Sequence, residues 1–425
     1  MPNDLHKRGL TRARHRDPAV RDPFWNWSNS VRALITFFAI VLVAHVSHGQ
    51  TRSWTAQNLL PENASFSEAD LAELQLGEPI ATRLTPRHKE EVAVYGVVRV
   101  QAPPEVFLQS FLDTLATKSN PAILEIGRFS SLPTFDDLKT LTLETGDIED
   151  LKKCVVGNCE LKLSAEMIDR FQKSVDWESS DYAAQATKVY KLMLLDYVRD
   201  YLNRGDRALI EYTDKPKTVS LLDGQRALLE SLPIAVAEAG QNGLVPIENT
   251  IVWSKIKFGL KPVLAINHTL IFKSQQKVGP QILVLSKQIY ANHYFDASIA
   301  LTGLTRNLSG SDEYYLFYEN HSLADGLRGL FTGIKRRLIE HEAVGGLRTV
   351  MQQTKIRLEA RALNQSGSGL SEEPSSGLIR LRVPRKQLLL LVICLTALAM
   401  LALAGYQRKT NTPLVKTFRK TQHAR

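Results

Sequence analysis

Two histidines stand among apolar residues in stretches that alternate in the manner of β-strands, within residues 262–273 and 281–304. Ligand pockets are mostly apolar with a few placed polar groups, so such side chains could line a cavity in a curved sheet and orient the polar end of a ligand. A histidine that finds hydrogen-bond partners inside an ordinary core would give the same pattern. The second histidine has two tyrosines and an aspartate close by. The candidate residues for a ligand cavity are His268, Tyr290, His293, Tyr294 and Asp296.

A catalytic use of these residues would pair His293 with Asp296 as general acid and base. Residues three apart on a strand point to opposite faces, so this pair would need a bulge or a loop to converge. The sequence contains no GxSxG, Walker, GxGxxG or HExxH motif, and His341-Glu342 lacks the second histidine of a zincin. We therefore expect a protein that is not an enzyme and needs no cofactor or metal, with a hydrolase as the least favoured alternative.

Cys154 and Cys159 flank a Gly-Asn turn signal. A disulfide between them would form in an oxidising compartment. A metal site needs more ligands than two thiols supply, and neither a CxxC redox motif nor a CxxCH haem motif is present. Because the closed loop would be short, such a bond would hold local shape more than it would stabilise the whole fold.

The formal net charge of +9, from 53 basic and 44 acidic residues, is concentrated at three places. Residues 1–32, 380–386 and 406–425 are strongly basic, whereas the rest of the chain is net acidic. These basic segments flank the two most apolar stretches of the chain, so a membrane explains the charge better than nucleic acid does.

The two apolar stretches differ in length and in their flanks. Residues 33–46 follow a basic leader and precede small residues, which is typical of a signal peptide cleaved after Gly49. An uncleaved anchor and a buried core helix are the alternatives. Residues 388–405 carry no charge and have the length of a transmembrane helix, with basic residues on both sides. If the first stretch directs export, the body of the protein lies outside the cytoplasm.

These segments divide the chain into five parts and place the main domain on the exported, periplasmic or extracellular side of a cell membrane, crossed once or twice. The parts are a basic leader with a signal peptide or signal anchor (1–49), an exported α+β domain (50–363) with a helical insertion (164–250), a flexible tether with a basic juxtamembrane segment (364–386), a transmembrane helix (387–406) and a basic cytoplasmic tail (407–425).

Within the body, short helix and strand patterns are followed by a helical middle and then by long strands. The strands are expected to lead into one long helix from about 323 to 363, which could bend at Gly345-Gly346. The other expected elements are strands at 80–84, 91–100, 262–273, 281–304 and 313–318, a helix opening at Pro103-Pro104, and helices at 164–171, 183–204 and 221–232.

One ordered set of residues runs through the body: Leu74, Gly77-Glu78-Pro79, the strand 92–100, Ala102 to Phe107, and later Leu347, Met351, Lys355 and Leu358-Glu359. This order resembles the START-like (SRPBCC) helix-grip superfamily. The resemblance implies an α+β fold in which a curved antiparallel sheet packs on a long C-terminal helix and encloses a cavity for lipids or other hydrophobic ligands. The segment 164–250 would then be an insertion. The run 286–296, with the cysteine pair, also looks like segments of exported bacterial proteins, a likeness that implies no function.

We therefore expect a membrane-anchored exported domain that binds a hydrophobic or amphipathic ligand, such as a lipid or hydrophobic small molecule, without catalysis. The alternative is an envelope structural or protein-interaction module with no ligand cavity. In both cases the membrane is the partner that the sequence indicates, through the C-terminal helix. Nucleic acid is not expected, and the sequence names no protein partner.

Overall fold

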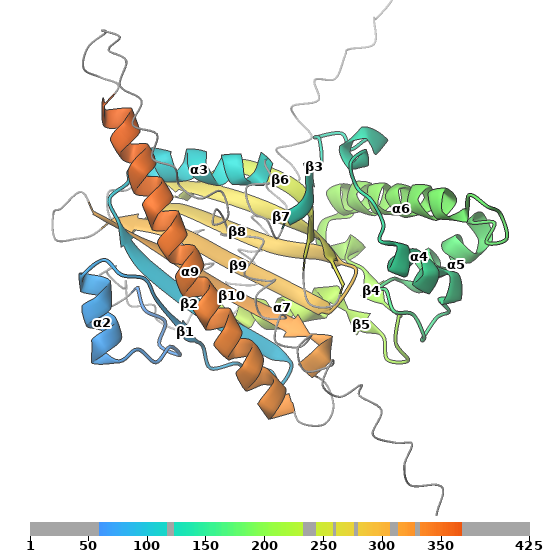
Figure 1. Ribbon diagram of the computed structural model, residues 1–425, viewed down its shortest axis with the longest axis horizontal. Helices are drawn as coiled ribbons and strands as arrows, with labels where there is room; N and C mark the ends of the chain where they lie inside the picture. Colours follow the sequence, from blue (N-terminus) through green and yellow to red (C-terminus); the bar gives the residue numbers. More distant parts are fainter. Residues whose placement is uncertain are drawn as a thin grey trace, which may run out of the picture. The chain divides into compact units, whose positions relative to one another are not determined.

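The computed structural model describes residues 59–116, 123–232, 244–257, 261–275, 279–306, 313–327 and 332–367. Together they form an α+β protein with a large antiparallel sheet and helices, as the sequence predicts (Figure 1). The expected leader 1–49, transmembrane helix 387–406 and tail 407–425 lie outside these residues. Within the described ranges, no helix combines the length and the apolar composition that a membrane span requires.

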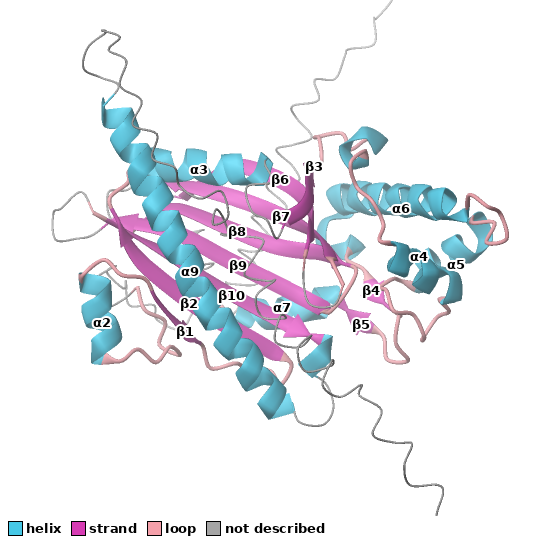
Figure 2. Cartoon of the chain, in the orientation of Figure 1, coloured by secondary structure: helices cyan, strands magenta, loops and turns pink. Residues whose placement is uncertain are grey.

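One antiparallel sheet organises the described residues (Figure 2). Its strand order is β1-β2-β10-β9-β8-β7-β6-β3. The strands from β6 to β10, which are the last five in the chain, form a meander, and β2 pairs with β10. The strands are β1 (Ile80–Arg83), β2 (Glu91–Val100), β3 (Ile123–Arg128), β6 (Leu244–Ile256), β7 (Val263–Ser274), β8 (Pro280–Ala291), β9 (Phe295–Arg306) and β10 (Tyr314–Ala324). A separate two-stranded ribbon contains β4 (Glu211–Tyr212) and β5 (Val219–Ser220).

The described helices are α2 (Glu68–Gln75), α3 (Pro104–Ala116), α4 (Thr145–Lys153), α5 (Ala165–Ser174), α6 (Tyr182–Arg204), α7 (Leu221–Ser231) and α9 (Thr332–Gly367). Three of the described helices, α2, α5 and α7, begin at a serine that caps them. The hydroxyl of Ser67 accepts the amide of Asp70 at the start of α2, and the Asp70 carboxylate accepts the amide of Ser67 in return. Ser164 and Ser220 cap α5 and α7 by accepting a backbone amide.

Two glycines show which helices cover which face of the sheet. A Cβ on Gly96 of β2 would meet Leu347 of α9, so this side of the sheet is the α9 face. A Cβ on Gly224 of α7 would meet Ala297 of β9, so the other side is the α7 face. α9 lies against β1 and β2, whereas α3 contacts β3, β8 and α9 itself (Figure 1). The α9 face is therefore flanked by two helices, one near each edge of the sheet.

The main apolar core lies on the α9 face. α3 contributes Phe107 and Phe111, and α9 contributes Leu347 and Met351, all of them buried among strand residues. Burial of each large apolar side chain contributes about 1.5–3 kcal/mol. These side chains fix α3 and α9 on the sheet.

The expected strand at 281–304 is in fact two strands. β8 ends at Ala291 and β9 begins at Phe295, and the residues between them make a tight turn in which Tyr294 has a φ of 61°. A positive φ is uncommon for a residue other than glycine. The alternation of apolar residues continues through this turn, so the sequence pattern alone did not reveal it.

Other boundaries also differ from expectation. β10 runs to Ala324, so the long helix starts at Thr332 rather than near 323, and it continues as one helix through Gly345-Gly346 to Gly367. β6 begins at Leu244, inside the range 164–250 that was expected to be helical. Strand pairing with β7 decides the structure there, because β6 borders β7 along most of its length.

Candidate ligand site

His268 lies on the α7 face of the sheet and is buried against α6. Its Nδ1 is 2.8 Å from the hydroxyl of Tyr201, and its Nε2 is 2.6 Å from Oδ1 of Asn249. Burial, with a smaller contribution from the charge of Lys287, lowers the pKa of His268 to about 3. The imidazole is therefore neutral at physiological pH, and both its nitrogens already have protein partners.

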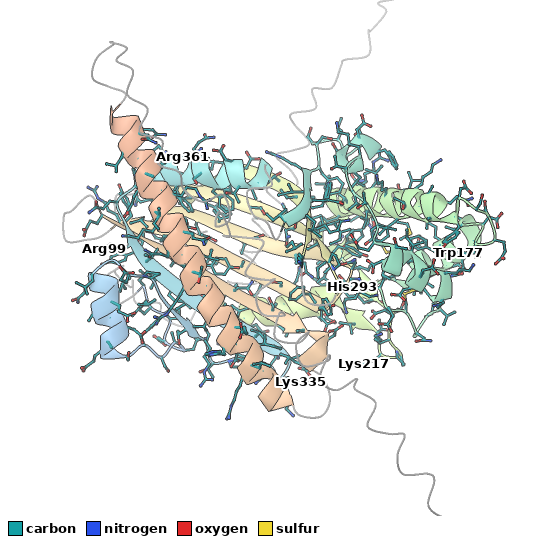
Figure 3. All side chains as sticks on the ribbon, viewed as in Figure 1. Arg99, Trp177, Lys217, His293, Lys335 and Arg361 are labelled. Atoms are coloured by element: carbon teal, nitrogen blue, oxygen red, sulfur yellow. A yellow bond between two sulfur atoms is a disulfide. The ribbon has the colours of Figure 1, made fainter. Side chains whose placement is uncertain are left out.

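His293 and Tyr294 lie in the turn between β8 and β9. Figure 3 labels His293. Its Nε2 is 3.1 Å from Oδ1 of Asp147 on α4, and its Nδ1 is 3.2 Å from the carbonyl oxygen of Glu160. The hydroxyl of Tyr294 accepts the amide of Lys261 at 3.2 Å. This turn therefore attaches α4 and the segment after that helix to the sheet.

Tyr290 and Asp296 belong to a second set of contacts beside this turn. The hydroxyl of Tyr290 is 3.0 Å from that of Tyr190 on α6 and donates to the carbonyl of Lys162 at 3.2 Å. Lys162 in turn donates to Oδ1 of Asp296 at 2.8 Å, with both side chains at most 3% exposed. The structure thus brings Tyr290, His293 and Asp296 near one another, and His268 lies on the same face of the neighbouring strand β7, two residues along from Ile266, the partner of Tyr290. Their side chains contact α4, α6 and the segment around Lys162.

A cavity of about 330 Å³ opens beside Asp296 at the N-terminus of α7. The loop before β2 contributes His88 and Glu90 to its wall, β5 contributes Ser220, and α7 contributes Gly224. Asp296 is the one sequence candidate that lines this cavity, and its carboxylate is held there by Lys162. Whether these residues bind a ligand stays a prediction.

A row of polar side chains that sequence reasoning missed crosses the α9 face. Asn320 of β10 pairs with Ala300, which pairs with Ser286, and that row continues through Thr269 to Thr250. Asn320 is two residues from Tyr318, the partner of Gly96, so the row shares the face that α9 contacts. The polar band consists of Thr250, Ser254, Thr269, Ser286, Gln288, Ser298, Asn320 and Ser322, each at most 5% exposed.

Part of the polar band is internally hydrogen-bonded. Ser298 and Ser322 lie 2.9 Å apart, Ser322 donates to Oδ1 of Asn320 at 2.9 Å, and Nδ2 of Asn320 donates to Ser298 at 3.3 Å. Thr269 and Ser286 are 3.4 Å apart. The β10 and β9 side of the band therefore forms a fixed network.

The β6 and β8 side of the band is different. Thr250 Oγ1, Ser254 Oγ and Gln288 Nε2 are buried and have no hydrogen-bond partner among the described residues. A buried polar group without a partner costs about 1–3 kcal/mol, and such groups in native proteins commonly meet a ligand or a water molecule. These three atoms make the α9 face the stronger candidate for a ligand site.

The signal for the polar band was present in the sequence as polar residues at alternate positions. Ser286 and Gln288 alternate along β8, and Asn320 and Ser322 along β10. Their strands also carry histidines and tyrosines, residue types that more often take part in catalysis or ligand binding. The sequence candidates on these strands therefore lay on the α7 face.

A charged cluster lies on the α7 face, centred on His321. Its Nδ1 is 2.6 Å from Glu91 and its Nε2 is 2.8 Å from Glu319. Burial alone would lower the pKa of His321, but the hydrogen bonds and charges of Glu319 and Glu91 outweigh it and raise the pKa to about 9. Burial would raise the pKa of Glu91, yet His321 and the amides of His88 and Arg87 hold it below its usual range. His321 and Glu91 are fully buried, Glu319 is partly exposed, and the cluster joins β2 to β10.

The expected disulfide between Cys154 and Cys159 is confirmed, with their Cα atoms 4.5 Å apart. The clipped hairpin packs against the segment between β4 and β5, where the amide of Gly157 donates to the carbonyl of Thr213 at 2.7 Å. A metal is not needed to explain this cysteine pair. The described residues also hold no cluster of histidine, cysteine and carboxylate side chains suited to a metal ion.

Fold and site together define an α+β protein whose sheet carries a buried band of uncharged polar side chains on the side of its last helix. Comparisons with protein-family models, curated proteins and solved structures found no match for this chain.

Proposed function

We propose that this chain is an exported, membrane-anchored protein that binds an amphipathic ligand on the α9 face without catalysing a reaction. The observation that carries the proposal is the polar band, in which Thr250, Ser254 and Gln288 keep buried polar atoms without partners among the described residues. These atoms lie beside an extensive apolar core. A ligand with one polar and one apolar part could place its polar part on the polar band and its apolar part against the apolar core.

The strand order supports a helix-grip arrangement for this binding mode. β2 lies next to the last strand β10, the meander continues to β6, and β3, which comes after α3, closes the far edge. α9 then packs back onto the start of the sheet. In such an arrangement a ligand would lie between the sheet and the helices that flank it, with its apolar part against Phe107 and Phe111 of α3.

Export and anchoring are supported by sequence features and by the disulfide. The apolar stretches at 33–46 and 388–405 supply a signal segment and a membrane span. A disulfide between Cys154 and Cys159 fits an oxidising compartment.

Ligand binding can be tested in intact cells by feeding them a photoactivatable fatty acid that enters their lipids. We expect crosslinked peptides from β7, β8 and β9 of the full-length chain, in addition to any from 387–406. Ala300→Phe would place a ring within the polar band and is expected to reduce strand labelling at least tenfold. Ile356→Phe, on the exposed side of α9, is the matched control. Crosslinks confined to 387–406 would contradict ligand binding and favour the interaction module.

Export can be tested through the two cysteines. A membrane-impermeant thiol reagent applied to intact cells is expected to label Cys154 and Cys159 only after reduction, because the disulfide removes both thiols and the body lies outside. The variant Cys154→Ser with Cys159→Ser controls for labelling of Cys394. Labelling that needs lysis but no reduction would place the body in the cytoplasm and refute the proposal.

A further inference from the structure

The polar band contains hydroxyl and carboxamide side chains and no charged side chain. Its members are three threonine or serine residues on β6 and β7, Ser286 and Gln288 on β8, and three residues on β9 and β10. Burying an ion without a counter-charge is far more costly than burying a hydroxyl group. The composition of the band therefore suits a polar ligand group that is itself uncharged.

Charged residues at the margin of this face already have partners. Glu248 of β6 pairs with Arg128, and Lys273 of β7 pairs with Glu105 at 3.0 Å. These ion pairs leave the neighbourhood of the band electrically balanced.

Arg357 of α9 is an exception, because its Nε and Nη2 atoms are buried and have no partner among the described residues. It lies far from the band. The nearby Lys355 donates to the carbonyl of Arg99, near the Val100 end of β2, whereas the band is level with Val92 and Val94. Six residues of strand separate the two positions by about 20 Å. A headgroup bound at the band would not contact this guanidinium.

Part of the polar band forms a row that runs across the strands. Asn320, Ser286, Thr269 and Thr250 are in register across β10, β8, β7 and β6, at right angles to the strands. Neighbouring strands are about 4.8 Å apart, so the polar groups of Thr250, Thr269 and Ser286 repeat at that spacing across β6, β7 and β8, while Ala300 of β9 interrupts the row before Asn320. A polyhydroxylated ring, or a short chain of such rings, presents hydroxyl groups at comparable intervals.

We propose that the polar part of the ligand is an uncharged polyhydroxyl group, such as the sugar headgroup of a glycolipid, lying across β6, β7 and β8. This inference rests on the proposed function. Gln288 Nε2 donates to a ligand hydroxyl, and the hydroxyls of Thr250 and Ser254 donate to or accept from others. The apolar part of the ligand extends toward α3.

The test uses the full-length chain in vesicles that contain one of three photoactivatable lipids with identical acyl chains. The lipids are a diglucosyl diacylglycerol, a phosphatidylglycerol and a phosphatidylcholine, each at the same mole fraction. Crosslinks to β7, β8 and β9 are counted by mass spectrometry relative to crosslinks in 387–406. The glycolipid is expected to label the strands at least tenfold more than the other two lipids.

Variants of the band should remove this preference selectively. Thr250→Val and Gln288→Leu keep side-chain size but lose hydrogen bonds, so each should bring glycolipid labelling close to that of phosphatidylcholine. Thr349→Val, on the exposed side of α9, is the control, and the intact Cys154–Cys159 disulfide with native protease resistance reports folding.

The outcomes separate the two proposals. Equal labelling by all three lipids would overturn the sugar-headgroup inference and leave lipid binding standing. Strongest labelling by phosphatidylglycerol, lost in Arg357→Gln, would replace it with an anionic headgroup bound near the C-terminal end of α9. No strand labelling by any lipid would overturn the inference together with the proposed function.

Discussion

Replacing His321 with leucine is expected to lower the free energy of unfolding by about 3–5 kcal/mol. The imidazole ring is fully buried between Glu91 and Glu319, 2.6 Å and 2.8 Å from their carboxylates. Leucine removes the cation and leaves two carboxylates buried near each other. Urea unfolding of the full-length chain in detergent, followed by circular dichroism, would measure the loss.

The same cluster predicts how stability depends on pH. The pKa of His321 is raised from 6.5 to about 9, so its contribution is fully present below pH 6.5 and is lost as the pH rises through about 9. A shift of this size corresponds to about 3 kcal/mol. Because the pKa of Glu91 is lowered, its contribution is present above its unfolded value and is lost as the pH falls. The contribution of this cluster to stability should therefore be greatest between about pH 5 and 6.5.

Two variants make this prediction specific. His321→Gln keeps a hydrogen-bonding side chain without a charge, so it should abolish the loss of stability between pH 6.5 and 9. His341→Gln replaces an exposed histidine of α9 and should change stability by no more than about 0.5 kcal/mol. A His321→Leu protein with wild-type stability and an unchanged pH profile would show that the cluster is not ionised as described.

Replacing Lys162 with methionine is the second large expected effect, a loss of about 3–5 kcal/mol. Its ammonium group donates to Asp296 at 2.8 Å and lies 4.7 Å from the centre of the Tyr212 ring, and the ion pair is almost entirely buried. Methionine fills the space but removes the charge that neutralises the Asp296 carboxylate. Urea unfolding monitored by circular dichroism would again give the value.

A double-mutant cycle separates the ion pair from packing. Lys162→Met combined with Asp296→Asn should cost clearly less than the two single changes added together, because the double variant no longer leaves the buried Asp296 carboxylate without its counter-charge. Lys173→Met is the matched control, since Lys173 pairs with Asp169 on the exposed side of α5 and such pairs contribute about 0.5 kcal/mol or less. Additive effects of Lys162 and Asp296 would mean that they act independently.

Much of the fold could be predicted because its elements have strong local signals. The 3.6-residue periodicity of α6 and the alternation in β2 gave their positions within a few residues. The turn at 292–294 was missed because Tyr294 adopts a positive φ that local sequence does not favour, and its position is fixed by contacts with Lys261 and α4. Strand order depends on pairings between distant segments, which periodicity does not encode.

The site was harder to predict for a related reason. Which face of a strand receives a helix is decided by tertiary packing, so His268 and Ser286 could not be assigned to opposite sides of the sheet from alternation alone. Only the close approach of Leu347 to Gly96 identifies the α9 face. Serine, threonine and asparagine are also ordinary in sheets, and they become informative only when they prove to be buried together.

The pairing of β2 with β10 has a consequence for how the chain folds. Arg99 and Glu313, which form an ion pair across these strands, are 214 positions apart in the sequence. Contacts between such distant segments form slowly, because the entropy cost of closing a long loop must be met before the contacts can contribute any favourable free energy. The meander from β6 to β9 can form through contacts between strands that are close in sequence before β2 pairs with β10. On this argument the α9 face is completed late, and a chain still emerging from the ribosome exposes an incomplete polar band until β10 and α9 have been synthesised.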